Sequence, residues 1–196
     1  MPATDSSSIG AIIPAAGTGT RMGGDTPKQF LEVDNVPILV QTVSRFLQVS
    51  TIRHIIVPLP EQYRAAAEEL FQQYFSPDQY KRLTCTVGGE TRQDSVWQGL
   101  KKLPAETEFV LVHDGARPFV KPGLIEQCLM AVFEHGAAIV AVPVRDTIKK
   151  VRVDGTIEET VDRRQLWHAQ TPQGASVQLL KKAYAIAVKD GFAGTD

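Results

Sequence analysis

The sequence has few cysteines, few aromatic residues and no excess of either charge. Its 196 residues include two cysteines and 7% aromatic residues, and 21 lysine and arginine residues balance 22 aspartate and glutamate residues. Cys85 and Cys128 lie far apart within apolar runs, which favours two buried free thiols over a disulfide or a metal pair. The net charge of −1 provides no field for nucleic acid or an anionic membrane. We therefore expect no nucleic-acid binding and no membrane binding.

Long hydrophobic runs are also absent. No apolar run approaches membrane-spanning length, and the polar N-terminal residues 1–8 lack the charged and apolar parts of a signal sequence. These absences predict a cytoplasmic protein. A hydrophobic content of 43% with 22% charged residues excludes the disordered and fibrous classes. We expect one domain over residues 1–196, because a chain of this length can bury a full core.

Short apolar runs alternate with amphipathic segments, as expected for a sheet covered by helices. Strands are predicted at Ile9–Ile13, His54–Leu59, Leu83–Val87, Phe109–His113 and Ala137–Val142. Most of these runs are continuously apolar, which is typical of strands buried on both faces, so the sheet should be mainly parallel. Apolar residues at helical spacing predict helices around 39–46, 96–103 and 124–133. The pattern indicates a doubly wound α/β domain.

The most informative motif follows the first apolar run. It reads Pro14-Ala-Ala-Gly-Thr-Gly-Thr-Arg21-Met-Gly-Gly-Asp-Thr-Pro27-Lys28-Gln29. Small residues let backbone N–H groups approach a ligand, and Arg21 and Lys28 add two cations, which suits a nucleoside triphosphate. The dinucleotide fingerprint would need glycine at Met22, and the P-loop would need Lys-Ser/Thr after Gly24. A structural glycine-rich turn is the alternative, but it gives no reason for both cations.

A second loop follows the predicted strand that ends at His113. It reads His113-Asp-Gly-Ala-Arg117-Pro. Asp114 is placed to hold Mg²⁺, which usually takes one or two carboxylates plus substrate phosphates, and Arg117 could grip an anionic substrate. The alternative is an Asp114 that caps the next turn and pairs with Arg117. His113 has no partner at metal spacing, so we assign it to the strand.

A third loop, Gly88-Gly-Glu-Thr-Arg92-Gln-Asp-Ser95, leads into a predicted helix. Its glycine amides, with Arg92 and Ser95, could read a base and its ribose, whereas ordinary helix capping by Thr91 or Asp94 is the alternative. Ligands in such folds bind beyond the carboxyl ends of the strands. We therefore expect the three loops to meet at one site.

After residue 142 the pattern changes to a polar hairpin. Thr147–Val153 and Thr156–Val161 flank Asp154-Gly155, a pair that suits a tight two-residue turn with positive φ angles. The hairpin is too polar for the central sheet. Because an isolated hairpin is marginally stable in water, an arm that packs on a partner is favoured over decoration of a sheet edge.

Together these residues resemble the 2-C-methyl-D-erythritol 4-phosphate cytidylyltransferases. The resemblance covers nearly the whole chain and rests on the ordered blocks Pro14-Ala-Ala-Gly-x-Gly-x-Arg21, Pro27-Lys28-Gln29, Gly88-Gly-x-x-Arg92-x-Asp-Ser95, His113-Asp-Gly-Ala-Arg117-Pro, Arg145-Asp-Thr147, Val161-Asp-Arg163 and Leu166-Trp-His-Ala-Gln-Thr-Pro172-Gln. Ribitol-5-phosphate cytidylyltransferases are the nearest alternative. They usually begin the first loop with Leu-Ala-Gly-Gly and lack the Val-Asp-Arg run, so Pro14-Ala-Ala and Asp162-Arg163 favour the methylerythritol family.

The resemblance implies a fold and a reaction. The fold is α/β, a three-layer Rossmann-like nucleotidyltransferase fold with a mostly parallel sheet and a protruding β-hairpin arm at about 145–168 through which a homodimer forms. In the reaction, the phosphate of 2-C-methyl-D-erythritol 4-phosphate attacks the α-phosphorus of CTP and expels pyrophosphate, with Mg²⁺ as cofactor, in the non-mevalonate route to isoprenoids. A phosphate nucleophile is already ionised at neutral pH, so catalysis should come from charge neutralisation and positioning.

The resemblance also implies roles for individual residues. Arg21 and Lys28 would be catalytic, stabilising the pentacovalent transition state. CTP would be bound by Pro14, Ala15, Ala16, Gly17, Thr18, Gly19, Gly89, Arg92, Ser95 and Gly115. Asp114 would organise Mg²⁺, and the substrate contacts would be made by Asp114, Arg117, Thr147 and Arg163. In this family the last two come from the partner's arm. We expect Trp167 and Phe119 to pack in the core or an interface rather than stack on a base.

The resemblance predicts one difference as well. Family members continue past Gly194-Thr-Asp196 into another helix and a closing strand, which includes an Asn-x-Lys-Ile-Thr segment whose lysine contacts the substrate phosphate. We expect this C-terminal helix and strand to be missing from this chain. In that case the alternative to an active enzyme is an inactive nucleotide-binding module.

Overall fold

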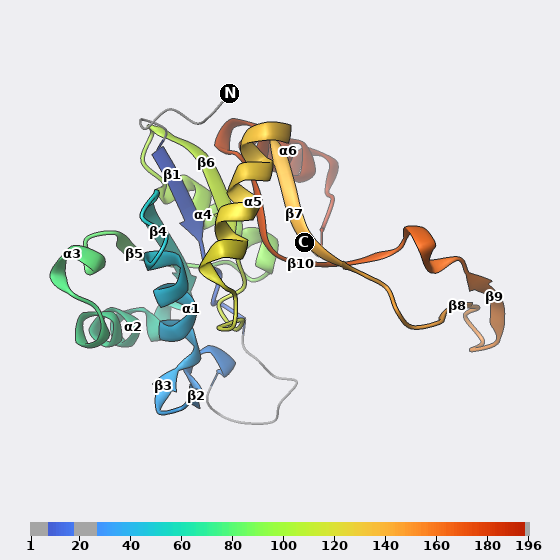
Figure 1. The fold of residues 1–196 in the computed structure, drawn as a ribbon, viewed down its shortest axis with the longest axis horizontal. Coiled ribbons are helices and arrows are strands. Elements are labelled where there is room, and N and C mark those ends of the chain that lie inside the picture. Colours follow the sequence, from blue (N-terminus) through green and yellow to red (C-terminus); the bar gives the residue numbers. More distant parts are fainter. Residues whose placement is uncertain (1–7, 18–26, 195–196) are drawn as a thin grey trace.

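A six-stranded sheet runs through the computed structural model of the chain, which describes residues 8–17 and 27–194 (Figure 1). Its order is β5-β4-β1-β6-β10-β7. These strands are β1 (Ser8–Ile12), β4 (Ile52–Leu59), β5 (Leu83–Val87), β6 (Thr107–Val112), β7 (Ala137–Pro143) and β10 (Trp167–Ser176). The pairs β1–β4, β1–β6 and β4–β5 are parallel, whereas β10 is antiparallel to β6 and β7. The prediction of a mostly parallel sheet is confirmed.

Helices cover both faces of the sheet and complete three layers (Figure 1). The helical elements are η2 (Lys28–Phe30), α1 (Ile38–Leu47), α2 (Glu61–Tyr74), α3 (Pro77–Tyr80), α4 (Arg92–Lys102), α5 (Pro122–His135), η3 (Arg163–Gln165) and α6 (Val177–Asp190). Helices α1, α2 and α5 share a core with Ala11 and Ile13. Helices α4 and α6 pack around Ile12 and Val112 on the other face. Successive side chains of a strand point to opposite faces, which places neighbouring residues of the β1 segment in different cores.

The predicted polar arm is present and stands away from the sheet (Figure 1). Its strands, which pair only with each other, are β8 (Ile148–Val151) and β9 (Ile157–Val161). The predicted two-residue turn is wrong, because only Gly155 in the turn has a positive φ, of 85°. The Arg152 N–H donates to the Thr156 carbonyl over 2.9 Å, which makes 153–155 a three-residue loop. The Asp154 carboxylate accepts from the N–H and hydroxyl of Thr156 and holds this loop.

A tight turn with two positive φ angles occurs instead in a hairpin that the sequence analysis did not predict. Its strands are β2 (Glu32–Val33) and β3 (Val36–Pro37). Asp34 and Asn35 between them have φ angles of 54° and 60°. Asp and Asn tolerate this conformation better than most residues, so their presence permits the short connection.

The predicted strands and helices are present, with strand ends shifted by at most two residues, but β10, α2, α3 and α6 were missed. Helix α2 buries only Ala67 and Phe71, and α6 buries only Val177. Strand β10 is rich in polar residues. A Cβ at Gly174 would lie 2.5 Å from Cδ2 of Leu111, so β10 can pack against Leu111 because residue 174 has no side chain. Periodicity does not reveal such packing.

Two aromatic residues that were predicted to pack in the core or in an interface are too exposed for the core. Phe119 is 75% exposed and Trp167 is 59% exposed, so the prediction of core packing is wrong and interface packing stays a prediction. Cys85 is half-buried and Cys128 is buried, and both are free thiols as predicted. Burial raises their pKa values to about 12 and about 11, respectively. None of the described helices combines the length and apolar character needed to cross a bilayer.

Candidate active site

The loops that follow β1, β5 and β6 meet beyond the carboxyl ends of these parallel strands. The Gly115 N–H donates to the Pro14 carbonyl over 3.1 Å and joins the loop after β6 to the loop after β1. The loop after β5 comes equally close, because a Cβ at Gly88 would lie 2.6 Å from the Cβ of Ala16. The expected meeting of loops is therefore seen in residues 14–17, 88–92 and 113–118. Thr18, Gly19 and Arg21 lie outside the described residues.

Internal hydrogen bonds shape the loop between β5 and α4. Thr91 and Asp94 form a capping box at the start of α4, so the capping alternative from the sequence is present. The Ser95 hydroxyl is buried, accepts from the Gly89 N–H over 3.0 Å and donates to the Thr91 carbonyl over 2.9 Å. A Cβ at Gly89 would lie 2.1 Å from that of Asp94, so only glycine fits. The loop is pre-shaped, and Arg92 is the first residue of the helix.

Asp114 lies between two arginines. Its Oδ1 accepts from Nε of Arg92 over 3.0 Å, and its Oδ2 accepts from Nε of Arg117 over 2.9 Å. Arg117 also donates to Oε1 of Gln170 over 2.5 Å, and the Asp114 N–H donates to the Thr171 hydroxyl over 3.4 Å. Two positive charges thus surround one carboxylate, and all three side chains are partly exposed. This net positive cluster is suited to bind phosphate groups.

Gln170 and Thr171 are site residues that sequence reasoning missed. Both belong to the block from Leu166 to Pro172, which carried the family resemblance without individual roles. They reach Asp114 and Arg117 only because β10 pairs beside β6. The sequence signal that could have found them was their position in a block that matches the family.

Gln29 ties the turn that carries Lys28 to the first loop. Its side chain is 4% exposed, and its Nε2 donates to the Ala15 carbonyl over 2.6 Å and to the Gly17 carbonyl over 3.4 Å. Lys28 begins η2 and is half-buried, one residue before this anchor. In the sequence, Gln29 belongs to the Pro27-Lys28-Gln29 block, which predicted no role for it. Its buried amide explains how a predicted catalytic lysine is held beside the glycine-rich loop.

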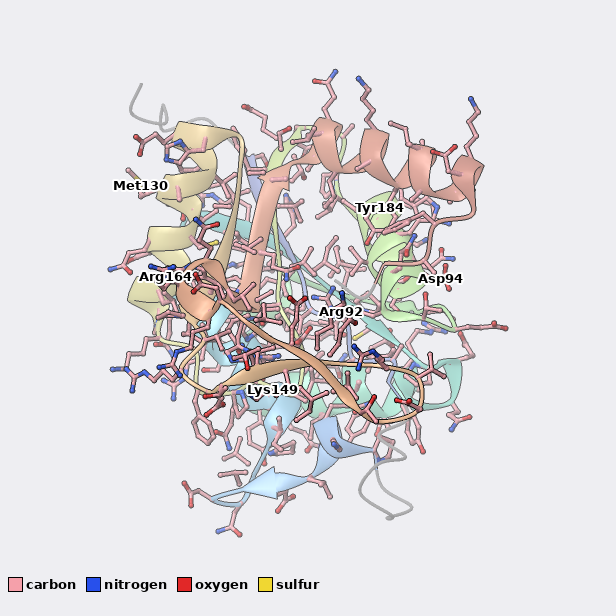
Figure 2. All side chains as sticks on the ribbon, turned by 90° about the vertical axis from the view of Figure 1, so that its right-hand side faces the viewer. Arg92, Asp94, Met130, Lys149, Arg164 and Tyr184 are labelled. Carbon is pink, nitrogen blue, oxygen red and sulfur yellow. The ribbon has the colours of Figure 1, made fainter. Side chains whose placement is uncertain are left out.

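Thr147 and Arg163 lie at the base of the arm. Thr147 is exposed, and the Arg163 guanidinium donates to the Arg145 carbonyl. In Figure 2 the molecule is viewed along the arm toward the sheet, and Lys149 and Arg164 are labelled on the arm. Thr147 directly precedes β8 and Arg163 begins η3, so both belong to the arm, which stands off from the sheet of its own chain (Figure 1).

A magnesium site built by the protein alone is not present in the described part of the chain. No group of three or more His, Cys, Asp and Glu side chains there could hold a metal ion. Mg²⁺, however, often binds one or two carboxylates and takes its other ligands from phosphates and water. The Asp114 carboxylate fits that donor set, because phosphate oxygens could replace it as the acceptors for Arg92 and Arg117.

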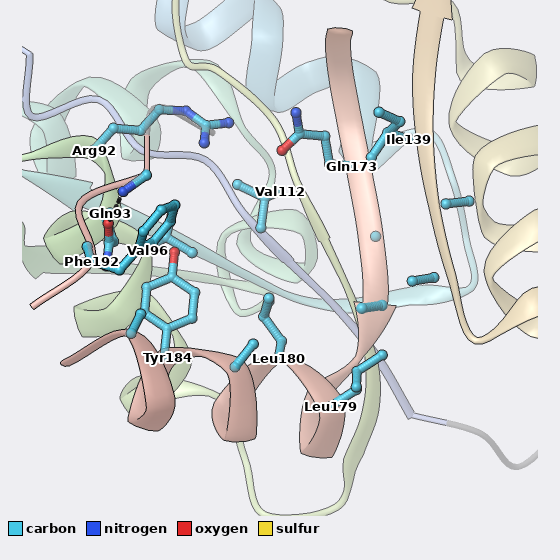
Figure 3. Close-up of a pocket in the computed structure, with 17 residues that line it drawn as sticks. Arg92, Gln93, Val96, Val112, Ile139, Gln173, Leu179, Leu180, Tyr184 and Phe192 are labelled. Carbon is cyan, nitrogen blue, oxygen red and sulfur yellow. Dashed lines mark hydrogen bonds between the residues drawn. The ribbon is translucent and has the colours of Figure 1, made fainter. Parts of the chain in front are cut away.

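A separate cavity of about 700 Å³ lies between the sheet, α4 and α6 (Figure 3). Arg92 and Gln93 stand at one end, and much of the wall is apolar, with Val112, Leu180 and Tyr184 among its residues. No sequence pattern predicted this cavity. It shares Arg92 with the three-loop site but offers few other groups for phosphate.

Comparison with known proteins identifies the family of this chain. The model of the 2-C-methyl-D-erythritol 4-phosphate cytidylyltransferase family matches residues 9–196. The chain belongs to this family. It is therefore a nucleotidyltransferase, and the resemblance read from the sequence blocks is confirmed.

Individual relatives agree with the family match. A 2-C-methyl-D-erythritol 4-phosphate cytidylyltransferase from Bacillus cytotoxicus is 49% identical over 185 residues, which are 94% of this chain and 80% of the relative. A solved 4-diphosphocytidyl-2C-methyl-D-erythritol synthase from Anaerococcus prevotii matches with a TM-score of 0.84 and 30% identity over 98% of this chain and 80% of its own. The family enzyme from Thermus thermophilus matches with a TM-score of 0.74 and 32% identity over 96% and 80%. These structures show the predicted nucleotidyltransferase fold.

The Gln29 anchor leads to a stability prediction. In Gln29→Glu, a carboxylate would replace the amide that donates to the Ala15 carbonyl, and at pH 8 we expect unfolding to require about 2 kcal/mol less than in the wild type. Burial beside carbonyls raises the pKa of the new carboxyl above its unfolded value. The loss should therefore shrink as the pH falls and the carboxyl gains a proton that it can donate.

Urea unfolding at pH 8 and pH 5 measures this difference. Gln48→Glu, at an exposed position after α1, is the matched control and should stay within about 0.5 kcal/mol of the wild type. Equal losses in the two variants, or a Gln29→Glu loss that does not depend on pH, would contradict the anchor.

Proposed function

We propose that this chain transfers the cytidylyl group of CTP to 2-C-methyl-D-erythritol 4-phosphate, which gives CDP-methylerythritol and pyrophosphate in the non-mevalonate isoprenoid pathway. Family membership over residues 9–196 supports the reaction. The single structural observation that carries the proposal is the Arg92–Asp114–Arg117 cluster where three loops meet, because both substrates bring phosphate groups. A cytoplasmic location belongs to the proposal, since CTP is an intracellular nucleotide.

Cytidylyl transfer requires positive charge at the reacting phosphates rather than a general base. An acceptor phosphate oxygen forms a bond to the α-phosphorus while the bond to pyrophosphate breaks, and the acceptor is already ionised. His113, the histidine next to the cluster, is unsuited to act as a base, because burial lowers its pKa and its Nε2 faces the Arg117 carbonyl. Arg21 and Lys28 would stabilise the charge that develops on the phosphoryl oxygens.

Backbone and side-chain groups divide the binding of the two substrates. The first loop, Gly89 and Gly115 would surround CTP with backbone groups, and Arg92 with the Ser95-shaped loop would bind its polar parts. Arg117 would hold the acceptor phosphate. Asp114 would hold Mg²⁺ together with phosphate oxygens, and the ion would supply further positive charge to the reacting phosphates.

A homodimer would complete the site. The arm pairs only with itself and stands away from its own sheet, as expected for a segment that packs on a partner (Figure 1). The exposed Trp167 at the base of the arm provides apolar surface for such an interface. Thr147 and Arg163 would then reach the acceptor in the partner's site.

The direct test is the release of pyrophosphate from CTP. With Mg²⁺ and 2-C-methyl-D-erythritol 4-phosphate we expect turnover, and with ribitol 5-phosphate or with EDTA we expect little or none. Turnover with ribitol 5-phosphate in preference would assign the chain to the alternative enzyme. CTP binding without turnover on either acceptor would indicate an inactive nucleotide-binding module.

Lys28 gives a mechanistic prediction. Lys28→Ala should lower kcat by at least ~10²-fold with folding intact, because a cation that stabilises the transition state is lost. Lys81→Ala removes an exposed lysine that pairs with Asp78 on the surface, so it serves as the control with near-normal kcat. Steady-state kinetics and thermal unfolding of both variants distinguish lost chemistry from lost folding. Near-normal turnover of Lys28→Ala would remove Lys28 from the mechanism.

Sharing of the site gives a second prediction. In a dimer that mixes Arg21→Ala and Arg163→Ala subunits, one of the two sites would contain both intact arginines. Equal amounts of the two subunits should recover roughly a quarter of wild-type activity, because half of the dimers are mixed and half of their sites are intact. Each variant alone should be nearly inactive. Purified mixed dimers without recovered activity would argue against a shared site.

A further inference from the structure

Side chains below the loop after β6 bind its backbone from the core. His113, one residue beyond β6, is 1% exposed, and its Nε2 lies 3.0 Å from the Arg117 carbonyl oxygen. A carbonyl oxygen only accepts hydrogen bonds, so Nε2 carries the proton and donates. The ring of Phe46 packs against the imidazole with centroids 5.0 Å apart. The imidazole is therefore held in one place, and its N–H donates to the backbone of the loop.

Helix α1 supplies two more anchors. The fully buried Thr42 hydroxyl lies 2.9 Å from the Gly115 carbonyl and equally far from the Ile38 carbonyl of its own helix, so one proton serves two acceptors. Nε of Arg45 reaches the Pro118 carbonyl at 3.4 Å. Together with His113, this helix binds the carbonyls of residues 115, 117 and 118.

These anchors decide which way the loop presents its charges. The carbonyls of Gly115 and Arg117 are bound on the core side, whereas the side chains of Asp114 and Arg117 are partly exposed and pair with each other, and Asp114 also pairs with Arg92. If the Arg117 peptide rotated away from His113, the Arg117 side chain would move with it. A displacement of about 1 Å in a group that positions a substrate is enough to reduce turnover strongly.

We propose that His113 and Thr42 are positioning residues for the loop after β6, with His113 holding Arg117 for the acceptor and Thr42 holding Gly115 beside CTP. They touch neither substrate, and they hold the backbone from which Arg117 and Asp114 reach the acceptor phosphate. This inference rests on the proposed cytidylyl transfer. Because the loop before α4 is shaped by Ser95 and its own capping box, the loss of the His113 hydrogen bond should affect the acceptor more than CTP.

Two substitutions of His113 test the hydrogen bond. His113→Phe keeps a ring but removes the donor, and we expect KM for 2-C-methyl-D-erythritol 4-phosphate to rise about tenfold while KM for CTP changes by less than about threefold. His113→Gln places an amide donor near the position of Nε2 and should recover most of that loss. His135→Phe, at an exposed position at the end of α5, should match the wild type. A purely structural role would lower the amount of active enzyme and leave both KM values unchanged.

Thr42 provides an independent pair if His113→Phe does not fold. Thr42→Val keeps the shape without the hydroxyl and should raise KM for CTP as well as for the acceptor, because Thr42 holds Gly115 on the CTP side of the loop. Thr42→Ser keeps the hydroxyl and should stay near the wild type. An unchanged acceptor KM in the folded variants, or no rescue by His113→Gln and Thr42→Ser, would overturn the inference. Wild-type turnover is the reference throughout, so a failure of the proposed function would appear in the wild-type chain itself.

Discussion

The parallel pairing of β1 with β4 and β6 is the constraint on which the site depends. Parallel strands release their chains at the same edge, so the loops after β1, β5 and β6 leave the sheet together. Small residues then allow close approach, since Gly88 lies against Ala16 and the Gly115 N–H binds the Pro14 carbonyl. The ladder of backbone hydrogen bonds thus gathers residues that are far apart in the chain.

Charge at this edge is organised before any substrate arrives. Asp114 accepts hydrogen bonds from Arg92 and Arg117, and this pairing holds two guanidinium groups near each other against their mutual repulsion. A phosphate group can take the place of the carboxylate as their acceptor, which would free Asp114 for a metal ion. The described loops are anchored from behind by Gln29, Ser95, Thr42 and His113, whose hydrogen bonds all go to backbone groups. Such anchors limit the reorganisation that binding would require.

Much of the fold could be predicted, because the strands buried on both faces are continuous apolar runs. Strand β10 could not, since its pairing between β6 and β7 depends on Gly174 fitting against Leu111 rather than on an apolar pattern. The types of the hairpin turns could not be predicted either. Asp154-Gly155 looked like a two-residue turn, but only Gly155 adopts positive φ, whereas Asp34 and Asn35 both do so in an unpredicted hairpin. Local propensity allows several turns, and the register of the flanking strands selects one of them.

The sequence by itself determined the family, the order of the apolar strands and the residue types available for phosphate chemistry, because these depend on local pattern and on spacing along the chain. Only the tertiary structure decided which of those residues meet. It brought Arg92 to the Asp114–Arg117 pair, added Gln170 and Thr171 from β10, and left Thr147 and Arg163 on the arm, whose strands form a sheet of their own. The physical reason is that contacts between distant residues follow from strand pairing and side-chain packing, and neither can be read from one segment alone.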